Sequence, residues 1–208
     1  MLAEQRNPLL RIVAYIVILS ALMLVVIADA NSAGAKFFED SLTERSQEAL
    51  LLLAALGMLF MASRLQHVST LALAFAGFFM VSFIRELDAL LEQNIGTGTW
   101  QVLVTIVLLA VFYRLRVNWS GFKNQLSGHL ESYSFGLFIA GFLTTYIFSR
   151  LIGNEELWLA ILEENYRRSA KNAVEESVEL LGYALLLFSV VEFYCRHAIS
   201  GRAESQAS

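Results

Sequence analysis

The chain has 208 residues, a formal net charge of −4 and a mean hydropathy of +0.57. Hydrophobic residues make up 57% of it and charged residues only 16%, which excludes an ordinary soluble domain, where about half and about a quarter are typical. The acidic balance argues against a nucleic-acid partner, and a single cysteine, Cys195, excludes an internal disulfide and a paired-cysteine metal site.

The apolar residues are concentrated in six long blocks. A helix of about 20 residues crosses the ~30 Å hydrocarbon core of a bilayer, so each block predicts one transmembrane helix. The blocks lie near residues 9–28, 48–63, 68–84, 100–113, 135–152 and 180–194. We therefore predict an all-α fold, a polytopic bundle of six transmembrane helices that forms a single domain over residues 1–200. The small polar residues 201–208 are expected to be a disordered tail.

Two local patterns mark the beginning of the chain. The segment Ala28-Asp29-Ala30 resembles a signal-peptidase site, but the apolar block before it is longer than the usual ~7–15 residues of a leader. We therefore expect this block to be kept as the first span. The sequence Ser41-Leu42-Thr43-Glu44 has the form of a capping box, which predicts that the second helix starts near Ser41.

A polar segment with helical spacing separates the last two spans. Asn154 is a good N-cap, and Glu163 and Arg167 stand four residues apart in the order that favours an ion pair on one helix. An apolar stripe accompanies these charges. The segment therefore predicts one extra interfacial amphipathic helix near residues 154–172.

Basic residues indicate the orientation in the membrane. Arg114, Arg116 and Lys123 fall in one connection that contains almost no acid, and such loops stay in the cytoplasm. With six spans, both termini lie on that same side. We therefore expect a multi-pass protein of the cell's inner (plasma) membrane with cytoplasmic N and C termini.

The acidic residues are distributed unevenly between the two sides. Fifteen of the nineteen fall on the predicted outer side: Asp29, Glu39, Asp40, Glu44, Glu48, Glu86, Asp88, Glu92, Glu155, Glu156, Glu163, Glu164, Glu175, Glu176 and Glu179. Acidic residues contribute little to topology, so the rule that orients spans does not explain this excess.

Some of these acids stand where a helix enters the membrane, at the outer ends of spans two, three and six. The candidate cluster consists of Glu44, Glu48, Arg85, Glu86, Asp88, Glu175, Glu176 and Glu179. A charge at that depth is costly and normally faces the bundle interior with a partner. We therefore expect the three helix ends to converge, with Glu179 ionised and paired with Arg85 or Lys171.

Three interpretations of this cluster compete. The acids form ion pairs and caps that lock the helix ends, or they bind a divalent cation or line a cation-selective vestibule, or they relay protons. The functional hypothesis is cation binding or translocation, of a divalent metal or a proton, through an acidic outer vestibule. No other cofactor is indicated, and no individual metal ligand is assigned.

Two other classes of function stay open. A non-catalytic scaffold or assembly subunit would use the helix near 154–172 to dock a protein partner or a second copy of the chain. An intramembrane metallohydrolase would use His67, His129 and His197. The sequence holds no nucleophile elbow, phosphate-binding loop, zincin or dinucleotide pattern, which argues against an enzyme.

The topology is tested by reporter fusions. Fusions at Ser127 and after Arg202 are expected to report a cytoplasmic location, and a fusion near Gly98 an external one, because the basic connection fixes the inner side. An external signal after Arg202 would contradict six spans and favour five spans behind a cleaved leader.

Overall fold

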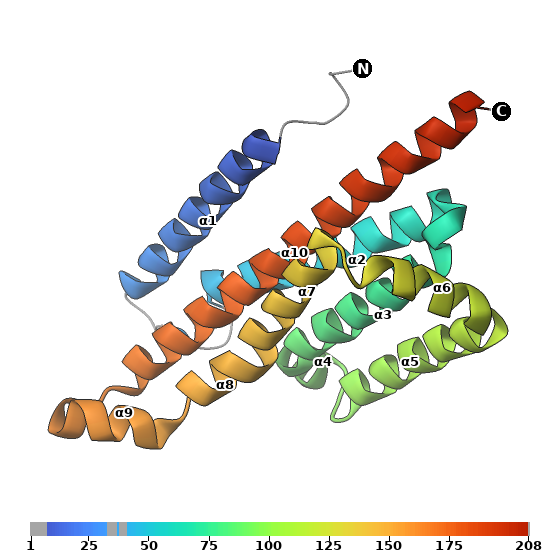
Figure 1. The fold of residues 1–208 in the computed structure, drawn as a ribbon. Helices are drawn as coiled ribbons and strands as arrows, with labels where there is room; N and C mark the ends of the chain where they lie inside the picture. Colours follow the sequence, from blue (N-terminus) through green and yellow to red (C-terminus); the bar gives the residue numbers. More distant parts are fainter. Residues whose placement is uncertain (1–7, 33–36, 38–40, 208) are drawn as a thin grey trace. The chain divides into compact units, whose positions relative to one another are not determined.

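The structure is a computed structural model that describes residues 8–32, 37 and 41–207 and, beyond residue 197, the backbone alone. The described residues are 90% helical and include no strand (Figure 1). The elements in chain order are α1 (Pro8–Ala30), α2 (Leu42–Arg64), η1 (Gln66–Val68), α3 (Ser69–Glu86), α4 (Asp88–Asn94), α5 (Thr99–Val117), α6 (Trp119–His129), α7 (Tyr133–Phe142), η2 (Leu143–Phe148), α8 (Ser149–Ile152), α9 (Glu155–Leu162), η3 (Glu163–Asn165) and α10 (Arg168–Ala207).

Six helical stretches of the described chain are long and apolar enough to cross a membrane. They are Pro8–Ala30, Leu42–Arg64, Gln66–Glu86, Thr99–Val117, Tyr133–Ile152 and Arg168–His197. The predicted all-helical fold with six such helices is confirmed by length and composition. Most of the helices run past their apolar blocks into polar residues, and the sixth begins at Arg168 where the block begins near 180. The position of these helices in a membrane stays a prediction.

The start of α2 is fixed by two acceptors. The Oγ of Ser41 accepts the N–H of Glu44 at 3.1 Å, which confirms Ser41 as the N-cap. The carboxylate of Asp29, at the end of α1, accepts the backbone N–H groups of Leu42 at 3.0 Å and Thr43 at 2.7 Å. A buried negative charge on these open amides is favourable because the helix dipole is positive there. Asp29 therefore ties the end of α1 to the start of α2. Of the other outer acids, Glu39 and Asp40 lie outside the described residues.

The prediction of a single helix near residues 154–172 is wrong. Asn154 is the predicted N-cap and accepts the N–H of Glu156 at 2.8 Å, but α9 ends at Leu162, where Glu163 has a φ of +46°. The indole N–H of Trp158 donates to the carbonyl of Ile152 at 2.6 Å and holds α9 against the end of α8. The chain then turns and begins α10, so the expected helical pairing of Glu163 with Arg167 is interrupted.

Other departures from the expected elements are smaller. The connections after α3 and α5 contain the short helices α4 and α6, where no helix was predicted. The segment that forms α6 has apolar residues at helical spacing, namely Trp119, Phe122 and Leu126. This pattern is so short that the sequence analysis assigned the segment to a loop. At the C terminus α10 continues to Ala207, into the segment 201–208 for which we expected disorder.

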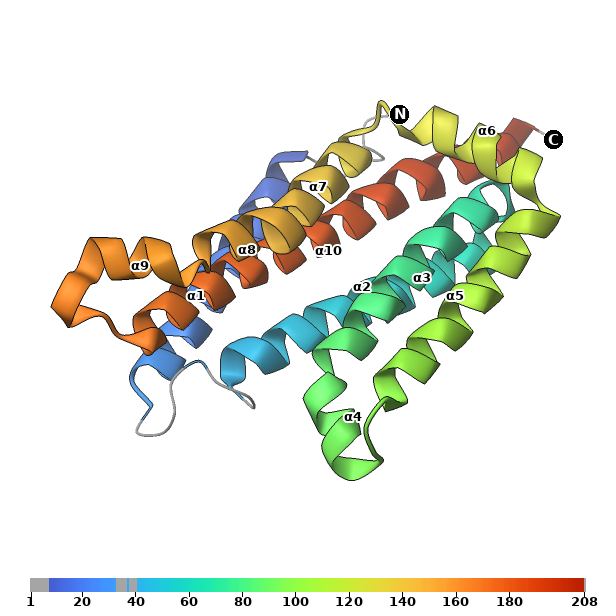
Figure 2. The same ribbon diagram turned by 90° about the horizontal axis from the view of Figure 1, so that it is seen from below.

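The chain forms two compact units. The first contains Met1–Gln47 and Ile139–Leu186, and the second contains Glu48–Phe138 and Leu187–Ser208. In the first unit, the end of α7, η2 and α8 run beside the first half of α10 (Figures 1 and 2). A side chain at Gly141 would meet the carbonyl of Gly182 at 2.8 Å, so the two helix backbones touch at these glycines. Within this contact η2 is a π-helical turn, a geometry often found at functional sites.

The second unit is built on the pairing of α3 and α5. The two helices lie side by side with α4 at the turn between them, as Figure 2 shows. A Cβ at Gly77 would lie 2.5 Å from a methyl group of Val111, so the glycine allows the close approach. An aromatic core adjoins this pair, with the ring of Phe75 4.7 Å from that of Phe138 and 6.2 Å from that of Phe193.

The glycine contact in the first unit gives a stability prediction. A Cβ at Gly182 would collide with the hydroxyl of Thr145 and lie 2.9 Å from its backbone nitrogen. Gly182→Ala should therefore lower the free energy of unfolding by about 1–3 kcal/mol, although alanine favours a helix by about 1 kcal/mol. The matched control is Gly136→Ala, where a new Cβ meets nothing within 4 Å and stability should hold or rise. Equal thermal unfolding of the two variants in detergent would contradict the contact.

Candidate functional site

The residues that could carry function in the first unit lie where α8 meets the start of α10. Ser149 and Arg150 come from the first turn of α8, directly after the π-helical turn. Lys171, Glu175 and Glu179 follow one another at four-residue spacing on α10, so they form one stripe along that helix. We call these five residues, together with Glu176, the acid–base cluster.

Glu179 is the most deeply buried acid of the cluster. Its side chain is only 5% exposed, and its Oε1 lies 2.8 Å from a guanidinium nitrogen of Arg150. The hydroxyl of Ser149 also donates to that oxygen at 3.2 Å. A buried, ionised carboxylate needs a cation, and Arg150 supplies one from α8. The side chain of Arg150 is itself 51% exposed, so the ion pair joins a buried carboxylate to a guanidinium that solvent can reach.

Glu175 lies between two cations. One oxygen is 3.1 Å from Arg150 and the other is 2.8 Å from the ammonium group of Lys171. Lys171 also donates to the carbonyl of Gly153 at 3.4 Å, at the end of α8. Arg150 thus bridges Glu175 and Glu179, and Lys171 links the start of α10 to the chain after α8.

Glu176 connects the cluster to α2. The side-chain amide of Gln47 donates to a carboxylate oxygen of Glu176 at 2.9 Å and to its backbone carbonyl at 3.1 Å. Gln47 is almost fully buried, so this polar contact is shielded from solvent. With three carboxylates and two cations, the cluster carries a formal charge of −1.

A line of hydroxyl groups leads from Glu179 through α8 into η2. Ser149 has one hydroxyl proton but two acceptors within reach, Glu179 and the carbonyl of Thr145 one turn earlier. The Oγ1 of Thr145 is buried and has no hydrogen-bond partner among the described residues. It faces the backbone of α10 at Gly182, where it fills the space that a side chain would take.

The sequence-predicted residues are only partly brought together. Glu175, Glu176 and Glu179 share the acid–base cluster. The structure gives Glu179 a partner that the sequence analysis did not name, Arg150, and places Lys171 against Glu175. Arg150 was overlooked although it stands near the end of span five, as Glu179 stands near the start of span six. Antiparallel neighbours place such positions at the same depth, and that signal was present in the sequence.

The other predicted site residues stand elsewhere in the described chain. Glu44 is in the first turn of α2, at the cap formed by Ser41. Glu48, Arg85, Glu86 and Asp88 belong to the second unit. There Arg85 lies 3.5 Å from Glu86, and Asp88 accepts the N–H of Ala89. A site shared by all three helix ends stays a prediction.

The three histidines gather in the second unit. The ring of His197 lies 5.5 Å from that of His67 and 6.0 Å from that of His129, and Phe193 packs against it. Within the described residues, however, no three side chains of His, Cys, Asp or Glu are arranged to hold a metal ion. His129 is fully buried, 3.2 Å from the hydroxyl of Ser132. The gathered rings therefore pack with an aromatic core.

Comparison with known protein families, curated proteins and solved structures finds no match to this chain. Its function is therefore inferred from the geometry of its own residues.

The buried histidine gives a prediction about pH. Burial, and secondarily the charge of Arg196, lowers the pKa of His129 from 6.5 to about 4. Between pH 4 and pH 6.5, His129 binds a proton in the unfolded chain but stays neutral in the folded chain. The stability that neutral His129 contributes is therefore complete above pH 6.5 and is lost as pH falls toward 4, by up to about 3 kcal/mol.

Thermal unfolding of the wild type and of His129→Gln, recorded from pH 7.5 to 4.5, tests this dependence. The wild type should lose more stability than the variant across that range, while the carboxylates common to both contribute equally. Parallel curves would contradict a neutral buried His129.

Proposed function

We propose that the protein moves protons across the membrane, with the carboxylate of Glu179 as the group that binds and releases them. The observation that supports the proposal most strongly is the setting of Glu179, which is buried and touches both Ser149 and Arg150. Burying an acid inside a helix bundle costs free energy, and such groups commonly serve proton or ion pathways.

The half-exposed Arg150 allows Glu179 to exist in two states. In one, Glu179 is ionised and bound to the guanidinium at 2.8 Å. In the other, a proton from the outer side binds Glu179, and Arg150 turns to Glu175, which it already contacts at 3.1 Å. Because water reaches Arg150, freeing it costs far less than stranding a fully buried cation.

Ser149 supplies a second contact for the transferred proton. When Glu179 is protonated, its O–H can donate to the Oγ of Ser149 while Ser149 donates to the carbonyl of Thr145. When Glu179 is ionised, the hydroxyl of Ser149 turns back to it. The open Oγ1 of Thr145 lies one turn deeper in the same span, so the hydroxyl line runs inward from Glu179.

A proton fits this site better than a divalent metal. The cluster already holds two cationic side chains, and its described residues provide no set of three metal ligands. Glu175 and Glu176 keep a negative formal charge at its rim, which attracts cations to the predicted outer side. In this proposal the termini are cytoplasmic, and protons enter through the outer acids.

The proposal is tested by proton flux into proteoliposomes driven by an imposed potassium diffusion potential. Wild-type protein should acidify or alkalinise the lumen faster than empty vesicles, and Glu179→Gln should abolish that difference because glutamine binds no proton. The matched control is Glu164→Gln, an exposed acid of η3 outside the cluster, which should retain full flux.

Two further variants are measured in the same flux assay. Ser149→Ala should reduce the flux several-fold, since it removes the hydroxyl and leaves the ion pair. If Glu179→Gln does not fold, Glu179→Asp keeps the acid and should restore partial flux. Wild-type flux equal to that of empty vesicles, or full flux through folded Glu179→Gln, would refute the proposal.

The second candidate function is a non-catalytic assembly subunit, favoured by the apolar residues that α9 exposes. Leu157, Leu159 and Ile161 have exposed fractions of 43%, 46% and 61%. A protein that carries no flux and co-purifies with a partner chain in fixed ratio would belong to this class.

A further inference from the structure

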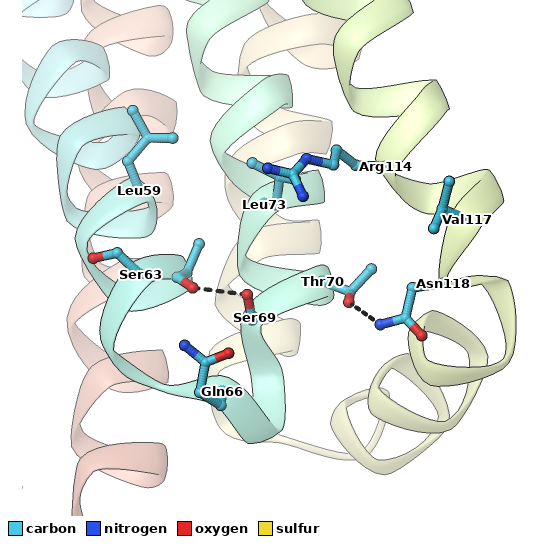
Figure 3. A pocket seen from close by; sticks show the side chains of 10 residues that line it. Leu59, Ser63, Gln66, Ser69, Thr70, Leu73, Arg114, Val117 and Asn118 are labelled. Atoms are coloured by element: carbon cyan, nitrogen blue, oxygen red, sulfur yellow. Dashed lines mark hydrogen bonds between the residues drawn. The ribbon is translucent and has the colours of Figure 1, made fainter.

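A cavity of about 400 Å³ lies within the second unit, where α2, η1, α3 and the end of α5 meet. Figure 3 shows the side chain of Arg114 extending from α5 toward α3, and the labelled polar residues Gln66, Ser69, Thr70 and Asn118 at the ends of the helices. The volume falls within the range of small-molecule sites, about 300–1,000 Å³.

The lining of the cavity changes from apolar to polar along the helices. Leu59 and Leu73 line it from positions inside α2 and α3, one turn or more from the helix ends. Gln66 and Ser69 line it at the connection between those helices. If α2 and α3 are spans, the apolar part faces the hydrocarbon core and the polar part faces the head groups.

Two hydrogen bonds hold the polar part of the wall in place. Ser69 donates to the carbonyl of Ala62 at 2.7 Å, and the amide of Asn118 donates to the Oγ1 of Thr70 at 2.8 Å. Thr70 thereby accepts a bond and keeps its own O–H, for which the described residues provide no acceptor. A donor is therefore held beside Arg114 in a largely buried position.

The charge of this region is entirely positive. Arg114 is the charged residue of the lining, and it has no ion-pair partner among the residues that the structure describes. Its neighbours in sequence add Arg116 and Lys123, and neither the segment 62–72 nor 112–126 contains an acid. A guanidinium in such a field binds an anion, and its paired N–H groups match a phosphate.

We propose that this cavity binds the phosphate head group of an anionic phospholipid. Arg114 holds the phosphate, and Thr70 and Gln66 donate to its oxygens. One acyl chain leaves along Leu59 and Leu73. The apolar part of the lining commits the site to a lipid, since free phosphate would gain nothing from it. The predicted cytoplasmic leaflet is the one that carries anionic lipids.

The test uses the purified full-length protein in detergent and native mass spectrometry. Phosphatidylglycerol, phosphatidylcholine and inorganic phosphate are titrated separately. We expect phosphatidylglycerol to bind about tenfold more tightly than phosphatidylcholine, and Arg114→Gln to weaken phosphatidylglycerol about tenfold through loss of the charge-assisted contact. Arg116→Gln is the matched control, since Arg116 lies on the same helix outside the lining and should leave the affinity unchanged.

Two further measurements distinguish a specific lipid site from nonspecific attraction to basic residues and from a site for free phosphate. Leu73→Trp, which fills the apolar part, should weaken phosphatidylglycerol binding while Arg114 is intact. Lipid-free Arg114→Gln should unfold at the wild-type temperature. Equal loss in Arg114→Gln and Arg116→Gln would overturn the proposal, as would binding of inorganic phosphate without preference for phosphatidylglycerol.

Discussion

The structure of the first unit depends on one electrostatic constraint, that a carboxylate buried between packed helices stays ionised only beside a cation. Glu179 is buried and lies 2.8 Å from Arg150 of α8, which supplies that cation. The pair joins α8 to α10. Glu175 and Lys171 then extend the contact outward, and Gln47 joins α2 to it through Glu176.

Close packing and the ion pair act on the same stretch of helix. Gly141 and Gly182 bring the backbones of α7 and α10 together, and the contact continues into the π-helical turn η2, where Thr145 meets Gly182. A π-helical turn holds an extra residue, so it rotates the residues that follow it. We attribute to this rotation the placement of Ser149 and Arg150 against α10. The π-helical turn and the unpartnered, buried hydroxyl of Thr145 are features that a purely structural bundle could avoid, which is why we associate them with function.

The sequence predicted the features set by composition and local spacing. Long apolar blocks gave six helices of the right length, and Ser41 and Asn154 were recognised as caps because capping depends on neighbouring residues. Features that depend on distant contacts were missed. The partner of Glu179 could be found only by knowing which helices adjoin, and no local spacing marked the break at Glu163, where φ is +46°. The gathering of the three histidines was considered, but spacing alone could not show that their rings would pack with phenylalanines.

The central claim, that Arg150 holds Glu179 in its ionised form, is tested most directly by a double-mutant cycle. The free energies of unfolding of Arg150→Gln, Glu179→Gln and the double variant are compared with that of the wild type. We predict that the double variant is less destabilised than the sum of the single variants, with a coupling energy on the order of 1–3 kcal/mol, because each single change leaves the other group without its partner. Additive effects within about 0.5 kcal/mol would contradict the pairing on which the proposed proton site rests.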